Sequence, residues 1–185
     1  MESVVVKKNE EKIITVLWTG EETEVSYDIM LTEPGASIKF LGLLIGKDTQ
    51  SLNMHVTVTH EAPQTTSKVI IKSALTDSAK VDIEGLVKIN PGAKGTNAWL
   101  AAHLLLLSEK AKGRAVPSLE ILENDIKAGH ATTVGRINDM EIFYLMSRGI
   151  SRQTAKSLIV EGFLQEMISQ FPDNLAKKAQ LELTI

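Results

Sequence analysis

The sequence predicts a mainly β protein that ends in a short helical segment, and three observations support this prediction. Between residues 13 and 89, short runs rich in Val, Ile and Thr are separated by Gly, Pro, Asp, Asn and Ser, as in all-β folds. Residues 51–59 alternate strictly between apolar and polar side chains, which indicates a strand with one buried face. After residue 137 the apolar residues take helical spacing and capping residues appear, which predicts helices.

Composition narrows the function classes. The chain has 185 residues, no cysteine and a net charge of −3, so it is long enough to bury a core without disulfides and lacks the basic excess that would favour nucleic acid or a membrane surface. We expect a cytoplasmic protein, because no apolar run approaches the roughly 20 residues that span a bilayer and the N-terminus is not signal-like. Without thiols, the chain cannot hold a thiolate-ligated cluster by itself.

Six strands are expected in the first half of the chain, at residues 13–18, 24–31, 37–45, 51–59, 66–75 and 80–89. In the fourth of these, Leu52, Met54, Val56 and Val58 lie on the face expected to be buried. Turn signals occur at 34–35, 46–48 and 90–92, but the hairpin dipeptides Asn-Gly and Asp-Gly are missing. That absence weakens an up-and-down meander and leaves a parallel β-helix and a β-sandwich as alternatives.

Residues 96–112 are ambiguous between helix and strand. Alanines and leucines dominate the segment, and both are strong helix formers. The four consecutive leucines from Leu104 to Leu107 form no amphipathic stripe, so a strand buried on both faces explains them equally well.

Two capped helices are expected at the C-terminal end. Asn138 can cap the first, with Glu141 in the capping-box position and Gly149 at its end. Ser151 can cap the second, whose apolar stripe is Ala155, Leu158, Ile159, Gly162, Phe163 and Met167. We expect Phe143 and Phe163 to be mostly internal. The predicted organisation is a β body over residues 1–137 and a helical subdomain over residues 138–185.

An ordered set of motifs in the second half resembles a known family. The motifs are Leu119-Glu120-Ile121, Asp125-Ile126-Lys127, His130, Val134-Gly135, Phe143-Tyr144-Leu145, Ser147-Arg148-Gly149-Ile150 and Glu161-Gly162-Phe163. Together they resemble the C-terminal half of SufD and, more broadly, the SufB/SufD proteins. Upstream motifs such as Thr59-His60-Glu61 and Leu105-Leu106-Leu107-Ser108 occur in the order expected of the same family.

The resemblance implies a right-handed parallel β-helix followed by a helical C-terminal subdomain. It also implies a non-catalytic scaffold of the SUF iron–sulfur cluster assembly machinery, shorter than typical members and lacking their N-terminal region. Its expected partners are a SufB-like subunit or a second copy, joined through the β-helices, and SufC, an ABC-type ATPase docked on the C-terminal helices. By resemblance and residue type, we expect Tyr144, Arg148 and Ile150 to contact that ATPase.

His130 is the candidate metal ligand. It matches a histidine near the proposed cluster-assembly site of SufD-like proteins, while a structural, hydrogen-bonded histidine is the competing interpretation. Ala128 stands where SufD-like chains commonly carry Cys, and Ala131 stands where SufB-like chains carry Glu. We therefore expect no cofactor to be bound stably by the isolated chain, and an iron–sulfur cluster only transiently, with a thiol-bearing partner.

The other three histidines are not expected to bind a metal, and two alternative functions remain open. His60 is explained equally well by a turn hydrogen bond, His55 is expected to be exposed, and His103 has no partner visible in the sequence. One alternative function is a small β-helix or cupin-like enzyme, which would need at least three ligands converging on a metal. The other is a degenerate structural paralogue that only dimerises.

Overall fold

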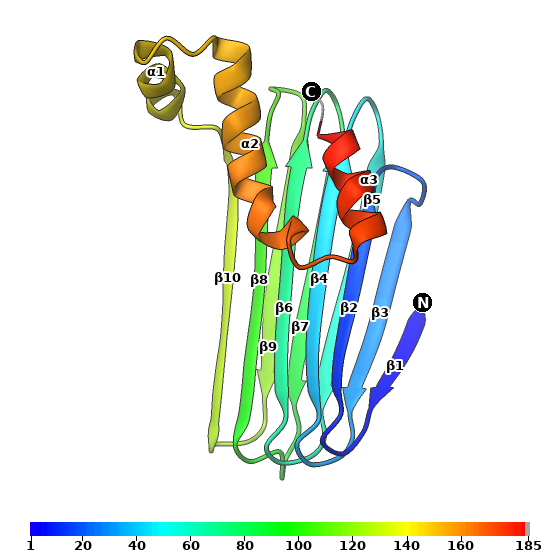
Figure 1. Cartoon of the computed structure of the whole chain (residues 1–185). Coiled ribbons are helices and arrows are strands. Elements are labelled where there is room, and N and C mark those ends of the chain that lie inside the picture. Colours follow the sequence, from blue (N-terminus) through cyan, green and yellow to red (C-terminus); the bar gives the residue numbers. More distant parts are fainter. Residues whose placement is uncertain (184–185) are drawn as a thin grey trace.

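Ten strands followed by three helices make up the described part of the chain, residues 1–183 of a computed structural model (Figure 1). The strands are β1 (Glu2–Val6), β2 (Glu11–Trp18), β3 (Glu24–Leu31), β4 (Ser37–Gly46), β5 (Ser51–His60), β6 (Thr66–Leu75), β7 (Lys80–Ile89), β8 (Thr96–Leu106), β9 (Lys112–Ile121) and β10 (Ile126–Arg136). The helices are α1 (Asp139–Ser147), α2 (Arg152–Ile168) and α3 (Asp173–Glu182).

The strands form a parallel β-solenoid. Odd-numbered strands build one sheet in the order β1-β3-β5-β7-β9, and even-numbered strands build the other in the order β10-β8-β6-β4-β2. All pairings are parallel, as in β5 with β7, where Ser51 lies opposite Lys80 and His60 opposite Ile89. Consecutive strands therefore alternate between the sheets as the chain winds. The predicted parallel β-helix is confirmed, and the β-sandwich alternative is wrong.

The main core lies between the two sheets. Leu52, Met54, Val56 and Val58 are all buried, as the alternation of β5 predicts. The ambiguous segment 96–106 is strand β8. Leu104 belongs to the core between the sheets, whereas Leu105 packs against the helices on the outer face. Apolar residues on both faces of one strand explain why this segment has no amphipathic stripe.

Helices α2 and α3 cover one part of the outer face of the even-numbered sheet (Figure 1). They bury a second apolar cluster that includes Leu41, Leu43 and Ile45 of β4 together with Val160, Leu164 and Met167 of α2. Lys72 on β6 fastens α2 to this face, because its Nζ donates a hydrogen bond of 2.7 Å to the carbonyl oxygen of Phe163. Ion pairs Lys47–Glu182 and Lys178–Glu21 join α3 to the strand body.

The helix starts follow the predicted caps. Asn138 Oδ1 accepts a hydrogen bond from the backbone N–H of Met140, and Ser151 Oγ accepts one from Thr154. Gly149, with φ of +85°, takes the left-handed conformation between α1 and α2, which a residue without Cβ adopts without steric cost.

Which side chains the helices bury differs from the prediction. The residues of α2 with least exposure are Ala155, Val160, Leu164, Met167 and Ile168, whereas Leu158 is 44% exposed. The expectation that Phe143 is internal is wrong, since it is 65% exposed. The reason is that α1 projects beyond the strands and packs against α2, turning Ile142 rather than Phe143 inward (Figure 1). None of the helices described for residues 1–183 is long and apolar enough to span a membrane.

Candidate functional site

The last coil of the solenoid, formed by β9 and β10, leaves two strand edges uncovered. Each strand is last in its sheet and pairs with one neighbour only, β9 with β7 and β10 with β8. Neither strand contains a fully buried residue, and Ile121 and Val134 are 43% and 44% exposed. Unpaired backbone next to exposed apolar side chains is the usual template for pairing with another chain.

His130 lies in the middle of this uncovered coil. It is in register with Leu100 on β8, a core residue that is 1% exposed, so its imidazole is directed to the side of the strand that faces the other sheet. It is nevertheless exposed, because no further coil covers β10. No hydrogen bond to His130 occurs among residues 1–183, so the structural hydrogen-bond interpretation has no support there, and both ring nitrogens remain available.

The two alanines that replace expected ligands lie on opposite faces of β10. Ala128 is two residues before His130 and in register with the core residue Ala98, so it shares the face of the histidine. Ala131 is in register with Ala101 and lies on the outer face. A thiol at position 128 would therefore stand on the same side of the strand as His130, roughly 7 Å along it.

His60 is a structural histidine. It is completely buried at the end of β5, with Nδ1 2.8 Å from the hydroxyl of Thr65 and Nε2 2.8 Å from the hydroxyl of Ser67. The Thr65 hydroxyl also lies 3.0 Å from that of Thr96. Burial lowers the pKa of His60 to about 4, so the ring is neutral near pH 7 and joins a closed network of hydroxyl groups.

The remaining histidines stand apart from His130. His103 on β8 is 2.9 Å from the hydroxyl of Thr133, and burial together with the charge of Lys72 lowers its pKa. His55 on β5 lies 3.5 Å from Glu84. Within residues 1–183, no group of three or more His, Asp or Glu side chains is placed to hold a metal ion. The three converging metal ligands that the enzyme alternative requires are thus not found in this part of the chain.

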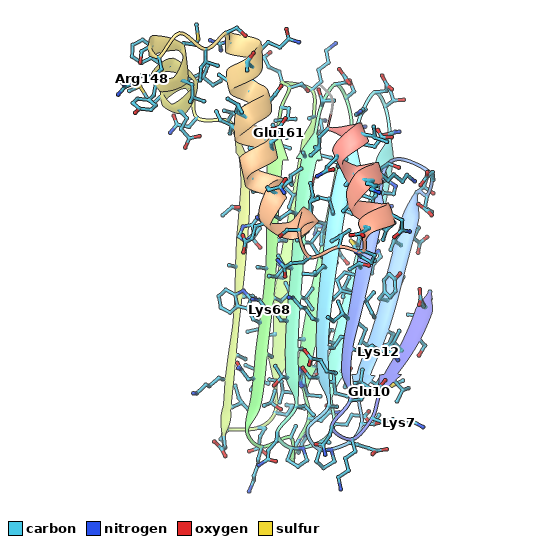
Figure 2. The ribbon with its side chains drawn as sticks, in the orientation of Figure 1. Lys7, Glu10, Lys12, Lys68, Arg148 and Glu161 are labelled. Carbon is cyan, nitrogen blue, oxygen red and sulfur yellow. The ribbon has the colours of Figure 1, made fainter. Side chains whose placement is uncertain are left out.

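A second exposed surface is carried by α1. Met140, Phe143, Tyr144 and Met146 are between 42% and 70% exposed, and Leu158 of α2 is also exposed. Arg148 stacks over Tyr144, with its guanidinium carbon 5.4 Å from the ring centroid, and lies at the outer end of the helical segment (Figure 2). Exposed aromatic and Arg side chains in one patch are typical of interface centres.

Two of the three predicted partner-contact residues are exposed side by side on this surface, and the third is half-buried. Tyr144 is 58% exposed, Arg148 is exposed beside it, and Ile150 is half-buried between α1 and α2. Met140 and Phe143 were missed, although their spacing of three residues places them on one side of α1. A hollow of about 420 Å³ between the two helices is lined by Met140, Tyr144 and Ile159, among others.

Comparison with known proteins places this chain in one family. Residues 3–163 match the family described as SUF system FeS cluster assembly, SufBD core domain. The chain belongs to the SufBD family. It is 37% identical, over 93% of its length, to an iron–sulfur cluster assembly SufBD family protein of Mycobacterium leprae. It is 36% identical, over 74% of its length, to the iron–sulfur cluster assembly protein SufD of Bacillus subtilis.

A SufBD family protein of Mycobacterium tuberculosis is 33% identical over 85% of the chain. The chain spans about half or less of these relatives: 47% of the M. leprae protein, 42% of the M. tuberculosis protein and 31% of B. subtilis SufD. The resemblance read from the motifs between residues 119 and 163 is confirmed.

Proposed function

We propose that this SufBD protein is a non-catalytic scaffold of SUF-type iron–sulfur cluster assembly. In this proposal the last coil, β9 and β10, pairs with a SufB-like subunit or a second copy, and the helical segment over residues 138–185 binds a SufC-like ABC ATPase. The observation that carries the proposal is the SufBD core match over a solenoid whose last coil is uncovered and holds His130. A cluster would be cargo of the assembled pair.

Pairing through the last coil is supported by its free strand edges. Val134 is 44% exposed and directed toward the end of the core, so a charge there would have to be buried on pairing, at high cost. Size-exclusion chromatography with light scattering should show a dimer at tens of micromolar, or a complex with the SufB-like partner, and Val134→Lys should abolish it. Leu158→Lys, at an equally exposed position on α2, is the matched control. A monomer in the unmodified protein, with no SufB-like complex, would contradict this step.

ATPase docking through α1 is supported by the patch around Tyr144 and Arg148. Removal of an aromatic or Arg anchor at an interface centre typically costs about 2 kcal/mol or more in binding. Tyr144→Ala and Arg148→Ala should therefore weaken co-purification with the SufC of the same organism, measured as a dissociation constant by calorimetry. Lys177→Ala on the exposed side of α3 should leave binding unchanged. If neither binding nor ATPase stimulation occurs with the unmodified protein, docking is refuted.

A contribution of His130 to cluster assembly is supported by its free ring nitrogens and central place in the last coil. Imidazole is one ligand where a cluster needs about four, usually thiolates, so the partner would supply the rest. Cluster formation, followed by absorption after anaerobic addition of iron and sulfide to the assembled complex, should fall in His130→Ala. The fully buried His60 is unsuitable for comparison, and His55→Ala on the outer face of β5 is the control. Equal cluster yield in both variants would remove His130 from the site.

A further inference from the structure

A cavity lies where α2 crosses the ends of strands β6 and β8. Its larger part has a volume of about 450 Å³ and a smaller adjoining part about 220 Å³. Both parts are lined by Leu107, Ile137, Arg152 and Lys156. We call the two parts together the junction cavity. Its larger part alone is within the range of about 300–1,000 Å³ that small-molecule sites occupy.

The junction cavity combines an apolar floor with a cationic wall. Leu107, Ile137 and Val160 provide the floor. Arg152 and Lys156 come from α2 and are four residues apart, so they stand on the same face of the helix. The hydroxyls of Thr76 and Ser157 also line the larger part. Such a site can hold an apolar body and an anionic group at the same time.

Two carboxylates, Glu109 and Asp139, line the smaller part of the junction cavity, but no acidic residue lines the larger part. The Arg152 guanidinium reaches Asp139 at 3.4 Å, and both side chains are largely exposed. Lys156 forms no ion pair with any carboxylate of residues 1–183, and the first turn of α2 contains no acidic residue. Two cations spaced by four residues repel each other. An anion bound between them would relieve that repulsion and form charge-assisted hydrogen bonds.

We propose that the junction cavity binds a small organic anion that carries an apolar body. Its carboxylate or phosphate group lies between Arg152 and Lys156, and its apolar body lies on Leu107, Ile137 and Val160. The smaller part of the cavity adjoins the end of β10 and the base of α1, since Arg136 and Ile142 line it, but neither part is lined by His130, Tyr144 or Arg148. The proposal does not depend on the scaffold function proposed above.

The probe for this site is 8-anilinonaphthalene-1-sulfonate, an aromatic anion whose fluorescence rises in apolar surroundings. One equivalent should bind to the full chain, and octyl phosphate should displace it at concentrations where 1-octanol and inorganic phosphate do not, because the site uses both parts of the ligand. Lys156→Gln should weaken binding about tenfold, as expected for loss of one charge-assisted bond. Lys156→Arg should restore it, and Lys94→Gln, an exposed cation on a distant turn, should have no effect.

A second variant tests the location. Ser157→Phe should obstruct the larger part of the cavity with a benzyl group and abolish probe binding, with thermal unfolding by circular dichroism confirming that each variant is folded. Binding that survives both Lys156→Gln and Ser157→Phe would refute the proposal. Binding that is instead lost in Phe143→Ser would also refute it, because the probe would then lie on the exposed side chains of α1. Dimer formation and SufC binding are measured separately, so their outcome leaves this test intact.

Discussion

The buried histidine of β5 makes the stability of the protein dependent on pH between about 7.5 and 5. The pKa of His60 is lowered from 6.5 to about 4 by burial. The Thr65 hydroxyl is also within 3.1 Å of the carbonyl oxygen of Ala62, so it donates there and accepts from Nδ1–H, which leaves Nε2 to accept from Ser67. Protonation of Nε2 would place a second donor against the Ser67 hydroxyl, and both residues are buried.

The sign and size of the effect follow from this shift. Below pH 6.5 the imidazole of His60 is protonated in the unfolded state but stays neutral in the folded state. Its contribution to the free energy of unfolding is therefore complete above pH 6.5 and is lost as the pH falls toward 4. At about 1.4 kcal/mol per pKa unit, the loss between about pH 7.5 and about pH 5 is about 2 kcal/mol. This interval lies above the ordinary carboxylate pKa range, so the histidines dominate it.

Urea unfolding of the wild type and of His60→Gln at the two pH values measures the effect. The variant keeps an amide that can donate and accept but does not titrate, so the part of the acid loss due to His60 should disappear. His130→Gln, which replaces an exposed histidine, should keep the wild-type loss. At the higher pH, His60→Gln should be less stable than the wild type by about 1–3 kcal/mol, because the substitution disturbs the hydrogen bonds of a buried site. An equal acid loss in His60→Gln and in the wild type would refute the reasoning.

Two further predictions concern contacts that hold β10 and α2 in place. Gly129→Ala would put a Cβ 2.6 Å from Cζ3 of Trp99, so we expect a destabilisation of about 1–3 kcal/mol by overpacking; thermal unfolding measures it, and an unchanged midpoint would show that the indole moves aside freely. Lys72→Met should cost about 1–3 kcal/mol, because the Phe163 carbonyl loses a charged donor, and limited trypsin digestion should then cut α2 faster. Lys68→Met, four residues before Lys72 on the open part of the same sheet (Figure 2), should change the stability by no more than about 0.5 kcal/mol and should leave the digestion of α2 unchanged.

The elements that local sequence predicted well are those with one buried face. In β5, polar and apolar side chains alternate because one side faces the core and the other faces water, so the period of two is visible in the sequence. The caps Asn138 and Ser151 act on backbone groups two or three residues away, so their role depends on neighbours in the sequence.

Elements at the ends of the solenoid were harder to recognise. Strand β10 reads IKAGHATTVGR, and within it only Ile126 and Val134 are large apolar residues, because the last coil has no further coil to pack against. Strand β8 was ambiguous for the opposite reason, since Leu104 is buried on one face and Leu105 is partly buried on the other. In both cases the burial of a strand is set by which chain segments lie beside it, and those segments are far away in the sequence.

The sequence by itself determined the mainly β character, the capped helices and, through its ordered motifs, membership of the SufBD family. Only the tertiary structure decided that Ala128 and His130 share a face while Ala131 does not, that Phe143 is exposed, and that Arg152 and Lys156 meet Leu107 in one cavity. The physical reason is that caps and alternation depend on backbone geometry within a few residues. Burial and convergence depend on the packing of segments that are far apart in the sequence, which local patterns do not encode.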